Sequence, residues 1–265
     1  SSVTGYIIIP DLIVTIPNLL YLFLGGTLVT AAANACNEIL ERDVDGLMRR
    51  TQSRPLPASR MNVGEAVFFF FFTLALGLFI LYIKFNALSA LLSFTSFLLY
   101  VFLYTPLKKV SPISVFVGAI PGSLPCLIGW VAGTNHMGSI AAWTLFIIQF
   151  FWQFPHFWSI AWIGHEDYEK AGMKMLPRTE KAGHFTAFQC VLYSAVLIPL
   201  SALPMVTLGG SLISVIPMAI AAVWFVYNSL NFFFFFSDLM ARKVMFASFI
   251  YLPVVLISLI IDKYV

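Results

Sequence analysis

IPNLLYLFLGGTLVTAAANACNEILERDVDGLMRRTQSR, residues 16–54, joins an apolar stretch to a dense run of charge. Residues 16–35 are long enough to cross a bilayer, which takes about 20 predominantly apolar residues in a helix. Residues 37–54 hold four of the 12 acidic and four of the 15 basic residues of the chain. Charge is costly beside a membrane and is seldom kept there without a function. The stretch therefore predicts a membrane helix that runs into a functional polar segment.

The rest of the chain repeats the apolar pattern. Hydrophobic residues make up 60% of the sequence, charged residues 10%, and the mean hydropathy is +0.91, whereas ordinary soluble domains carry about 25% charged residues. The predicted complete spans are 16–35, 64–83, 87–104, 112–132, 139–162, 187–206, 210–231 and 244–261. Ser1 to Ile9 is apolar but too short to cross, and we expect it to be the end of a truncated first span or a re-entrant piece. The sequence thus predicts an all-α, polytopic membrane helix bundle formed by a single domain, residues 1–265.

Basic residues lie in alternate loops. All of the 15 Lys and Arg residues except Lys84 and Lys263 fall in the loops that follow the first, third, fifth and seventh complete spans. By the positive-inside rule these loops face the cytoplasm, or the matrix in an organelle. The net charge of +3 reflects this topology, and we expect no nucleic-acid partner.

Asn37, Glu41 and Asp45 follow one another at four-residue intervals. Each such step turns only about 40° around an α-helix, so the three side chains form a column on one face. Carboxylate and amide oxygens are the ligands that hard divalent cations prefer. The column therefore favours a site for Mg²⁺, with a solvated loop of snorkelling side chains as the alternative.

A second acidic cluster, Glu166 to Glu169, follows the fifth complete span, as the first cluster follows the first. The two clusters thus lie on the same side of the membrane, where they could share cations that bind a diphosphate. Taken alone, EDYEK is also typical of an exposed helix surface with i,i+4 pairs.

His156, in WQFPHFW, lies about 9 Å inside the inner end of its predicted span at helical rise. An imidazole at this depth is a candidate functional group. A structural histidine that bonds to its neighbours is the alternative, because Pro155 leaves a backbone carbonyl without its helical partner.

Several motifs together resemble the UbiA superfamily of intramembrane prenyltransferases, and within it the branch that attaches a farnesyl group to haem. They are, in chain order, the Asn37–Glu41–Asp45 column with MRRTQSRPLP at 48–57, YTPLKK at 104–109, PGSLPCLIGW at 121–130, WQFPHFWSIAW at 152–162, EDYEKAGMKMLP at 166–177 and FASFIYLP at 246–253. The motifs occur in the order of the family and span nearly the whole chain.

The resemblance implies nine transmembrane helices, the first truncated here, around a central cavity that opens at the inner side. It implies that farnesyl diphosphate is ionised with Mg²⁺ and joined to a vinyl carbon of haem b to form haem O, a step toward haem A and terminal oxidases. A bacterial inner membrane, with the active site on the cytoplasmic side, is the expected location, or the mitochondrial inner membrane in a eukaryote. Haem A synthase is an expected partner.

The same resemblance implies roles for individual residues. Asn37, Glu41 and Asp45 would hold Mg²⁺–diphosphate from one side, and Glu166 and Asp167 from the other. The catalytic set is Asn37, Glu41, Asp45 and Asp167. The candidates for diphosphate contacts are Arg42, Arg50, Arg54 and Lys108. His156 would face the haem acceptor as a ligand or an orienting group.

Two other functions remain as alternatives. A relative from the same superfamily that prenylates an aromatic acid or a quinone precursor would share the diphosphate site and differ in its acceptor pocket. A secondary transporter or haem carrier would use the acidic side chains as ion ligands, but transporters usually place such ligands near the bilayer midplane. Here both acidic clusters lie at the inner rim.

Overall fold

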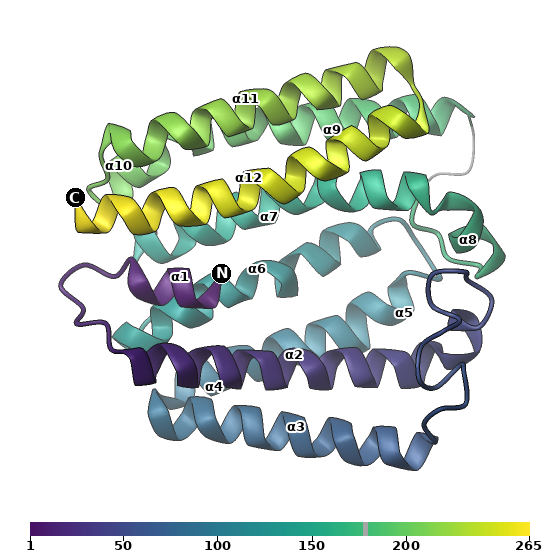
Figure 1. Cartoon of the computed structure of the whole chain (residues 1–265), viewed down its shortest axis with the longest axis horizontal. Helices are drawn as coiled ribbons and strands as arrows, with labels where there is room; N and C mark the ends of the chain where they lie inside the picture. The colour runs from purple at the N-terminus through teal and green to yellow at the C-terminus, as the bar shows by residue number, and fades with distance from the viewer. Residues whose placement is uncertain (177–179) are drawn as a thin grey trace.

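The structure is a computed structural model that describes residues 1–176 and 180–265, except for the side chains of 180–182. All regular elements in these two ranges are helical. They are α1 (Ser2–Ile7), α2 (Ile16–Asp45), α3 (Val63–Lys84), α4 (Ala87–Leu98), the π-helix η1 (Leu99–Tyr104), α5 (Thr105–Leu107), α6 (Ser114–Thr134), α7 (Ile140–Ile163), α8 (His165–Lys170), α9 (Glu180–Leu200), α10 (Leu203–Thr207), α11 (Leu212–Phe235) and α12 (Asp238–Tyr264). The long helices lie roughly side by side in one bundle (Figure 1).

Seven helices among the described residues are long and apolar enough to cross a membrane. They correspond to seven of the eight predicted complete spans. The remaining predicted span, 139–162, corresponds to α7, which has 24 residues but is not among the seven. Its tryptophans and the polar side chains of Gln149, Gln153 and His156 lower its mean hydropathy. The all-α membrane bundle is confirmed, whereas the count of nine transmembrane helices stays a prediction.

Polar residues mark where several of these helices begin. Thr15 caps α2 ahead of Pro17, and Asn62 and Glu65 form a reciprocal capping box at the start of α3. The side-chain oxygens of Ser211 and Ser237 cap α11 and α12, each by accepting one backbone N–H. The side chains thus satisfy backbone N–H groups that have no partner inside the helix.

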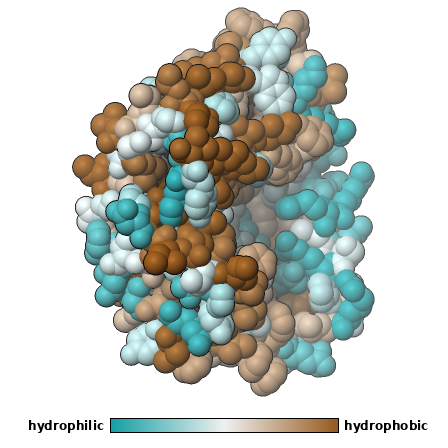
Figure 2. Space-filling model, turned by 60° about the vertical axis from the view of Figure 1, so that its left-hand side comes forward, coloured by the Kyte–Doolittle hydropathy of each residue, from teal (hydrophilic) through white to brown (hydrophobic). Residues whose placement is uncertain are grey.

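The loops predicted to share one side do so. The connections α2–α3, α5–α6, α7–α9 and α11–α12 all lie at one end of the bundle, opposite the end that holds α1 and the C-terminus (Figure 1). Pro177, Arg178 and the side chain of Lys181, which belong to one of these loops in the sequence, lie outside the described residues. Much of the surface between the two ends is hydrophobic, and many phenylalanines and leucines are exposed there (Figure 2). This surface fits contact with lipid.

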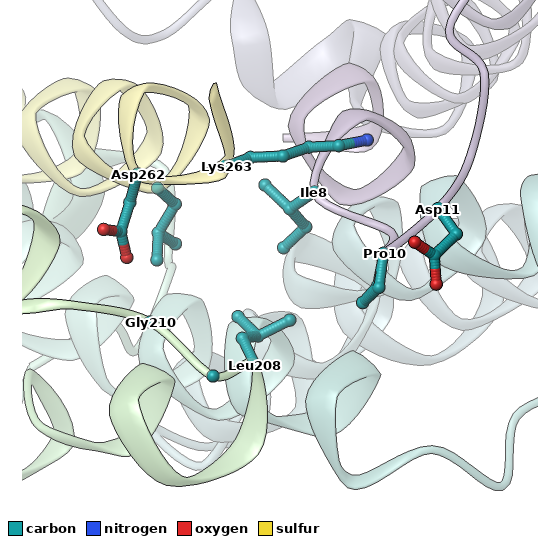
Figure 3. Close-up of a pocket in the computed structure, with 9 residues that line it drawn as sticks. Ile8, Pro10, Asp11, Leu208, Gly210, Asp262 and Lys263 are labelled. Carbon is teal, nitrogen blue, oxygen red and sulfur yellow. The ribbon is translucent and has the colours of Figure 1, made fainter. Parts of the chain in front are cut away.

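Lys84 and Lys263, the two basic residues outside these loops, have partners at the opposite end of the bundle. Nζ of Lys84 lies 4.6 Å from the centre of the Tyr21 ring. Nζ of Lys263 donates a 2.9 Å hydrogen bond to the carbonyl of Ile9, beside a cavity of about 310 Å³ (Figure 3). On the other side of this cavity the Asp262 carboxylate accepts a 2.8 Å hydrogen bond from the backbone N–H of Ser211. The Lys263 contact ties the end of α12 to the segment that follows α1.

Candidate active site

The acidic column at the end of α2 lines a cavity of about 190 Å³. This end of α2 lies at the end of the bundle that carries the basic loops (Figure 1). Asn37, Glu41 and Asp45 are only 5%, 3% and 0% exposed. Two carboxylates buried this deeply need compensating charges or hydrogen bonds. Their partners come from two other parts of the chain.

Lys108, just after α5, supplies the partner of Glu41. Its Nζ donates a 2.7 Å hydrogen bond to Glu41 Oε2 and lies 2.7 Å from Oε1. Asn37 Nδ2 also donates to Glu41 Oε2, at 2.9 Å. Burial lowers the pKa of Lys108, and the adjacent Glu41 charge opposes that change. Lys108 is thus a buried counter-ion inside the cavity.

Arg54 supplies the partner of Asp45. The loop after α2 folds back, so that Arg54 Nη1 donates a 2.7 Å hydrogen bond to Asp45 Oδ2. The loop is pinned there because Thr51 Oγ1 donates a 2.9 Å hydrogen bond to the Asp45 carbonyl. Arg54 Nε also lies 3.8 Å from Glu38. Each carboxylate of the column therefore has one basic partner.

One oxygen of each carboxylate is buried and accepts no assigned hydrogen bond from the described residues. Asp45 Oδ1 has no partner of either kind, whereas Glu41 Oε1 lies 2.7 Å from the Lys108 ammonium. Among the described residues, no cluster of three His, Cys, Asp or Glu side chains could hold a metal ion. The candidate ligands are therefore two carboxylates and one amide. Mg²⁺ is usually held by one or two carboxylates, with water and substrate phosphates completing its shell. The unpaired Asp45 Oδ1, with the Glu41 carboxylate one turn away, fits such an ion.

Aromatic and basic side chains form the other walls of the cavity. Arg50 Nη2 donates a 3.2 Å hydrogen bond to the Tyr168 hydroxyl. Burial raises the pKa of Tyr168, and Arg50 opposes that change. Tyr100 and Tyr104, four residues apart across the π-helix, line the cavity together with Lys108. Tyr104 and the two lysines of YTPLKK are the sequence signal for this wall, but they do not by themselves predict its tyrosines as site residues.

The second acidic motif lies at the same end but lines neighbouring cavities. Asp167 lines a cavity of about 200 Å³ that shares Arg50 and Tyr168 with the first. Glu166 and Asp167 both line a third, of about 330 Å³, with Arg49 and Asp238. The structure thus brings Asp167 next to the column without placing either acid in its cavity.

Arg42 is the basic candidate that the structure places elsewhere. Its Nε lies 3.0 Å from Asp43 Oδ1 in an exposed ion pair, and its side chain does not line the cavity. One residue corresponds to about 100° around a helix, which turns Arg42 away from Glu41. Arg50, Arg54 and Lys108 do line the cavity.

His156 lies in α7, one turn deeper than the cavity-lining Ile160, and is buried against α12. Its Nδ1 is 2.8 Å from Ser248 Oγ, and Ser248 Oγ donates a 2.5 Å hydrogen bond to the Met245 carbonyl. Since the hydroxyl has one proton, the neutral imidazole must donate from Nδ1, which leaves Nε2 as a free lone pair. Trp152 stacks on the ring, with centroids 4.8 Å apart.

The sequence of the chain is similar to those of known proteins. The model of the UbiA prenyltransferase family matches residues 1–250. A protoheme IX farnesyltransferase from Flavobacterium psychrophilum is 42% identical over 270 residues, which cover 100% of this chain and 89% of the relative. Another from Cytophaga hutchinsonii is 42% identical over 264 residues, or 99% and 92% of the two chains.

Solved structures share the fold. A structure described for digeranylgeranylglyceryl phosphate synthase has a TM-score of 0.78 at 24% identity and covers 99% of this chain and 91% of its own. A UbiA homologue from Archaeoglobus fulgidus, bound to GPP and Mg²⁺, has a TM-score of 0.63 at 17% identity, with coverage of 97% and 94%. At these identities the likeness is one of fold.

Proposed function

Because the chain belongs to the UbiA prenyltransferase family, we propose that it transfers the farnesyl group of farnesyl diphosphate to a vinyl group of haem b, which yields haem O. The observation that carries this proposal is the 42% identity to protoheme IX farnesyltransferases along the whole chain. The chain is an integral, multi-pass membrane protein. Its proposed location is a bacterial inner membrane with the cavity at the cytoplasmic side, and haem A synthase is a proposed partner.

Mg²⁺ is the proposed cofactor, and Asn37, Glu41 and Asp45 are the proposed residues that hold it. The buried, unpaired Asp45 Oδ1 and the neighbouring Glu41 carboxylate in the cavity support this assignment. Glu166 and Asp167 remain proposed ligands from the second motif. When bound, Mg²⁺ neutralises charge on the diphosphate.

The basic side chains of the cavity stabilise the leaving group. As the allylic carbon–oxygen bond of farnesyl diphosphate breaks, negative charge grows on the diphosphate oxygens. Lys108, Arg50 and Arg54 lie in the cavity to donate charge-assisted hydrogen bonds to these oxygens. Arg42 stays a proposed diphosphate contact that would have to leave Asp43 first.

The aromatic residues of the cavity protect the carbocation that forms next. Tyr100, Tyr104 and Phe157 line the cavity, where aromatic rings stabilise an allylic cation and keep water away from it. C1 of the farnesyl cation then bonds to the terminal vinyl carbon of haem b. Water adds to the inner vinyl carbon and loses a proton, which completes the hydroxyethylfarnesyl group.

The acceptor is tested directly by offering both classes of substrate. Membranes that contain the protein are incubated with farnesyl diphosphate, Mg²⁺ and either haem b or 4-hydroxybenzoate, and the products are identified by mass. We expect haem O and no prenylated benzoate. Prenylated benzoate without haem O would refute the proposal and favour the aromatic-acid alternative.

His156 is proposed to contact the haem acceptor through its free Nε2. Replacing His156 with alanine is expected to shift the Soret band of the haem-bound protein and to weaken haem binding by about tenfold, the usual scale for losing one ligand-orienting group. The exposed His136 provides the matched control, and His136→Ala is expected to keep the parental spectrum. Identical spectra for all three proteins would assign His156 a structural role instead.

A further inference from the structure

Thr105 is a buried residue of the YTPLKK motif to which no role has been assigned so far. It is 3% exposed and follows directly on the π-helix η1. Its Oγ1 donates a 2.9 Å hydrogen bond to the carbonyl of Tyr100. The same oxygen lies 3.0 Å from Asn37 Nδ2, although 68 positions separate the two residues in the sequence. Thr105 therefore joins the wall formed by η1 to the acidic column on α2.

The direction of these hydrogen bonds determines which end of the Asn37 amide faces the cavity. The hydroxyl of Thr105 has one proton, and the carbonyl of Tyr100 takes it. Toward Asn37 the hydroxyl can therefore only accept. The second partner, Glu41 Oε2, is a carboxylate oxygen 2.9 Å away and is also an acceptor. Both partners require the NH₂ group of Asn37, so its carbonyl oxygen is directed the other way.

This orientation matters for a cation. The two ends of an asparagine amide are nearly the same in shape but opposite in charge. An inward carbonyl oxygen adds a ligand to the unpaired Asp45 Oδ1 and the Glu41 carboxylate, whereas an inward NH₂ group would repel Mg²⁺. Glu41 Oε2 alone orients the Asn37 amide less strongly than Thr105 does, because it also accepts a hydrogen bond from Lys108.

We infer that Thr105 is a positioning residue that holds the Asn37 amide with its carbonyl oxygen toward the cation of the diphosphate site. The inference rests on the proposed function, since it concerns how the chain binds the metal of that reaction. The π-helix is part of the arrangement. It places the Tyr100 carbonyl where both the backbone N–H and the hydroxyl of Thr105 donate to it. Single π turns within helices are frequent at functional sites.

The test compares Thr105→Val with Thr105→Ser. Valine keeps the shape but loses the hydroxyl, and the Tyr100 carbonyl keeps the backbone N–H of residue 105 as a donor. Calorimetric titration of Mg²⁺ into protein with a non-reactive farnesyl thiodiphosphate measures the metal affinity. We expect Thr105→Val to weaken Mg²⁺ binding by about tenfold or more, the usual scale for losing an outer-shell partner. Thr105→Ser is expected to bind Mg²⁺ like the parent.

A double-mutant cycle separates positioning from a general structural effect. In an Asn37→Ala background, Thr105→Val is expected to cause no further loss of Mg²⁺ affinity, because the group through which it acts is gone. An unchanged Mg²⁺ affinity of Thr105→Val, or an equal loss in both backgrounds, would overturn the positioning role alone. A parental protein that binds no Mg²⁺ with the thiodiphosphate would overturn the proposed function and this inference together.

Discussion

Replacing Asp45 with asparagine is expected to reduce farnesyl transfer by more than about 100-fold, because losing even an outer-shell partner of a metal ligand typically costs 10–100-fold. Asp45 is fully buried, and its Oδ1 has no hydrogen-bond partner among the described residues. Asparagine keeps the shape but removes the charge that would bind Mg²⁺. Haem O formation by the purified protein measures the loss.

Asp43→Asn is the matched control for this prediction. Asp43 lies on the same helix turn, but it is exposed and pairs with Arg42 outside the cavity. Its variant is expected to keep parental activity, and haem binding by absorption is expected to survive in both variants. An Asp45→Asn protein that forms haem O at the parental rate would remove Asp45 from the metal site.

Replacing Lys108 with methionine is expected to destabilise the protein as well as to impair transfer. Lys108 and Glu41 form a buried ion pair, with side chains 9% and 4% exposed. Removing one partner of such a pair typically costs about 3–5 kcal/mol, because the other charge stays buried and uncompensated. The variant is therefore expected to unfold at a clearly lower temperature than the parent in detergent.

Two further variants test whether the broken ion pair causes this loss of stability. Lys109→Met removes the same charge from the exposed neighbouring position and is expected to change neither stability nor activity. Glu41→Gln combined with Lys108→Met is expected to regain much of the stability while remaining inactive, because neither charge is then left alone. If Lys108→Met unfolds at the parental temperature, the ion pair contributes nothing to the fold.

Local patterns in the sequence were enough to predict the bundle and the acidic column. Hydropathy located the spans, and the four-residue spacing placed Asn37, Glu41 and Asp45 on one face of α2, where the structure has them in one cavity. Loop charge predicted that both acidic motifs lie at one end, as they do (Figure 1). Their roles as ligands stay predictions.

The parts that depend on distant segments were harder to predict. No local spacing relates Thr105 or Lys108 to α2, because their contacts depend on the π-helix that precedes them. Tyr168 reaches the cavity because α8 folds back toward Arg50. The outward direction of Arg42 follows from helix geometry alone. For the position of this side chain, helical periodicity was a better predictor than the family resemblance.

The position of the cation tests the central claim most directly. Mn²⁺ can replace Mg²⁺ at oxygen sites and is located by anomalous scattering in crystals of the protein with farnesyl thiodiphosphate. We predict an anomalous peak in the cavity of Asn37, Glu41 and Asp45, with the diphosphate between it and Lys108. A peak held only by Glu166, Asp167 and Asp238 in the neighbouring cavity, with none at the column, would contradict the account.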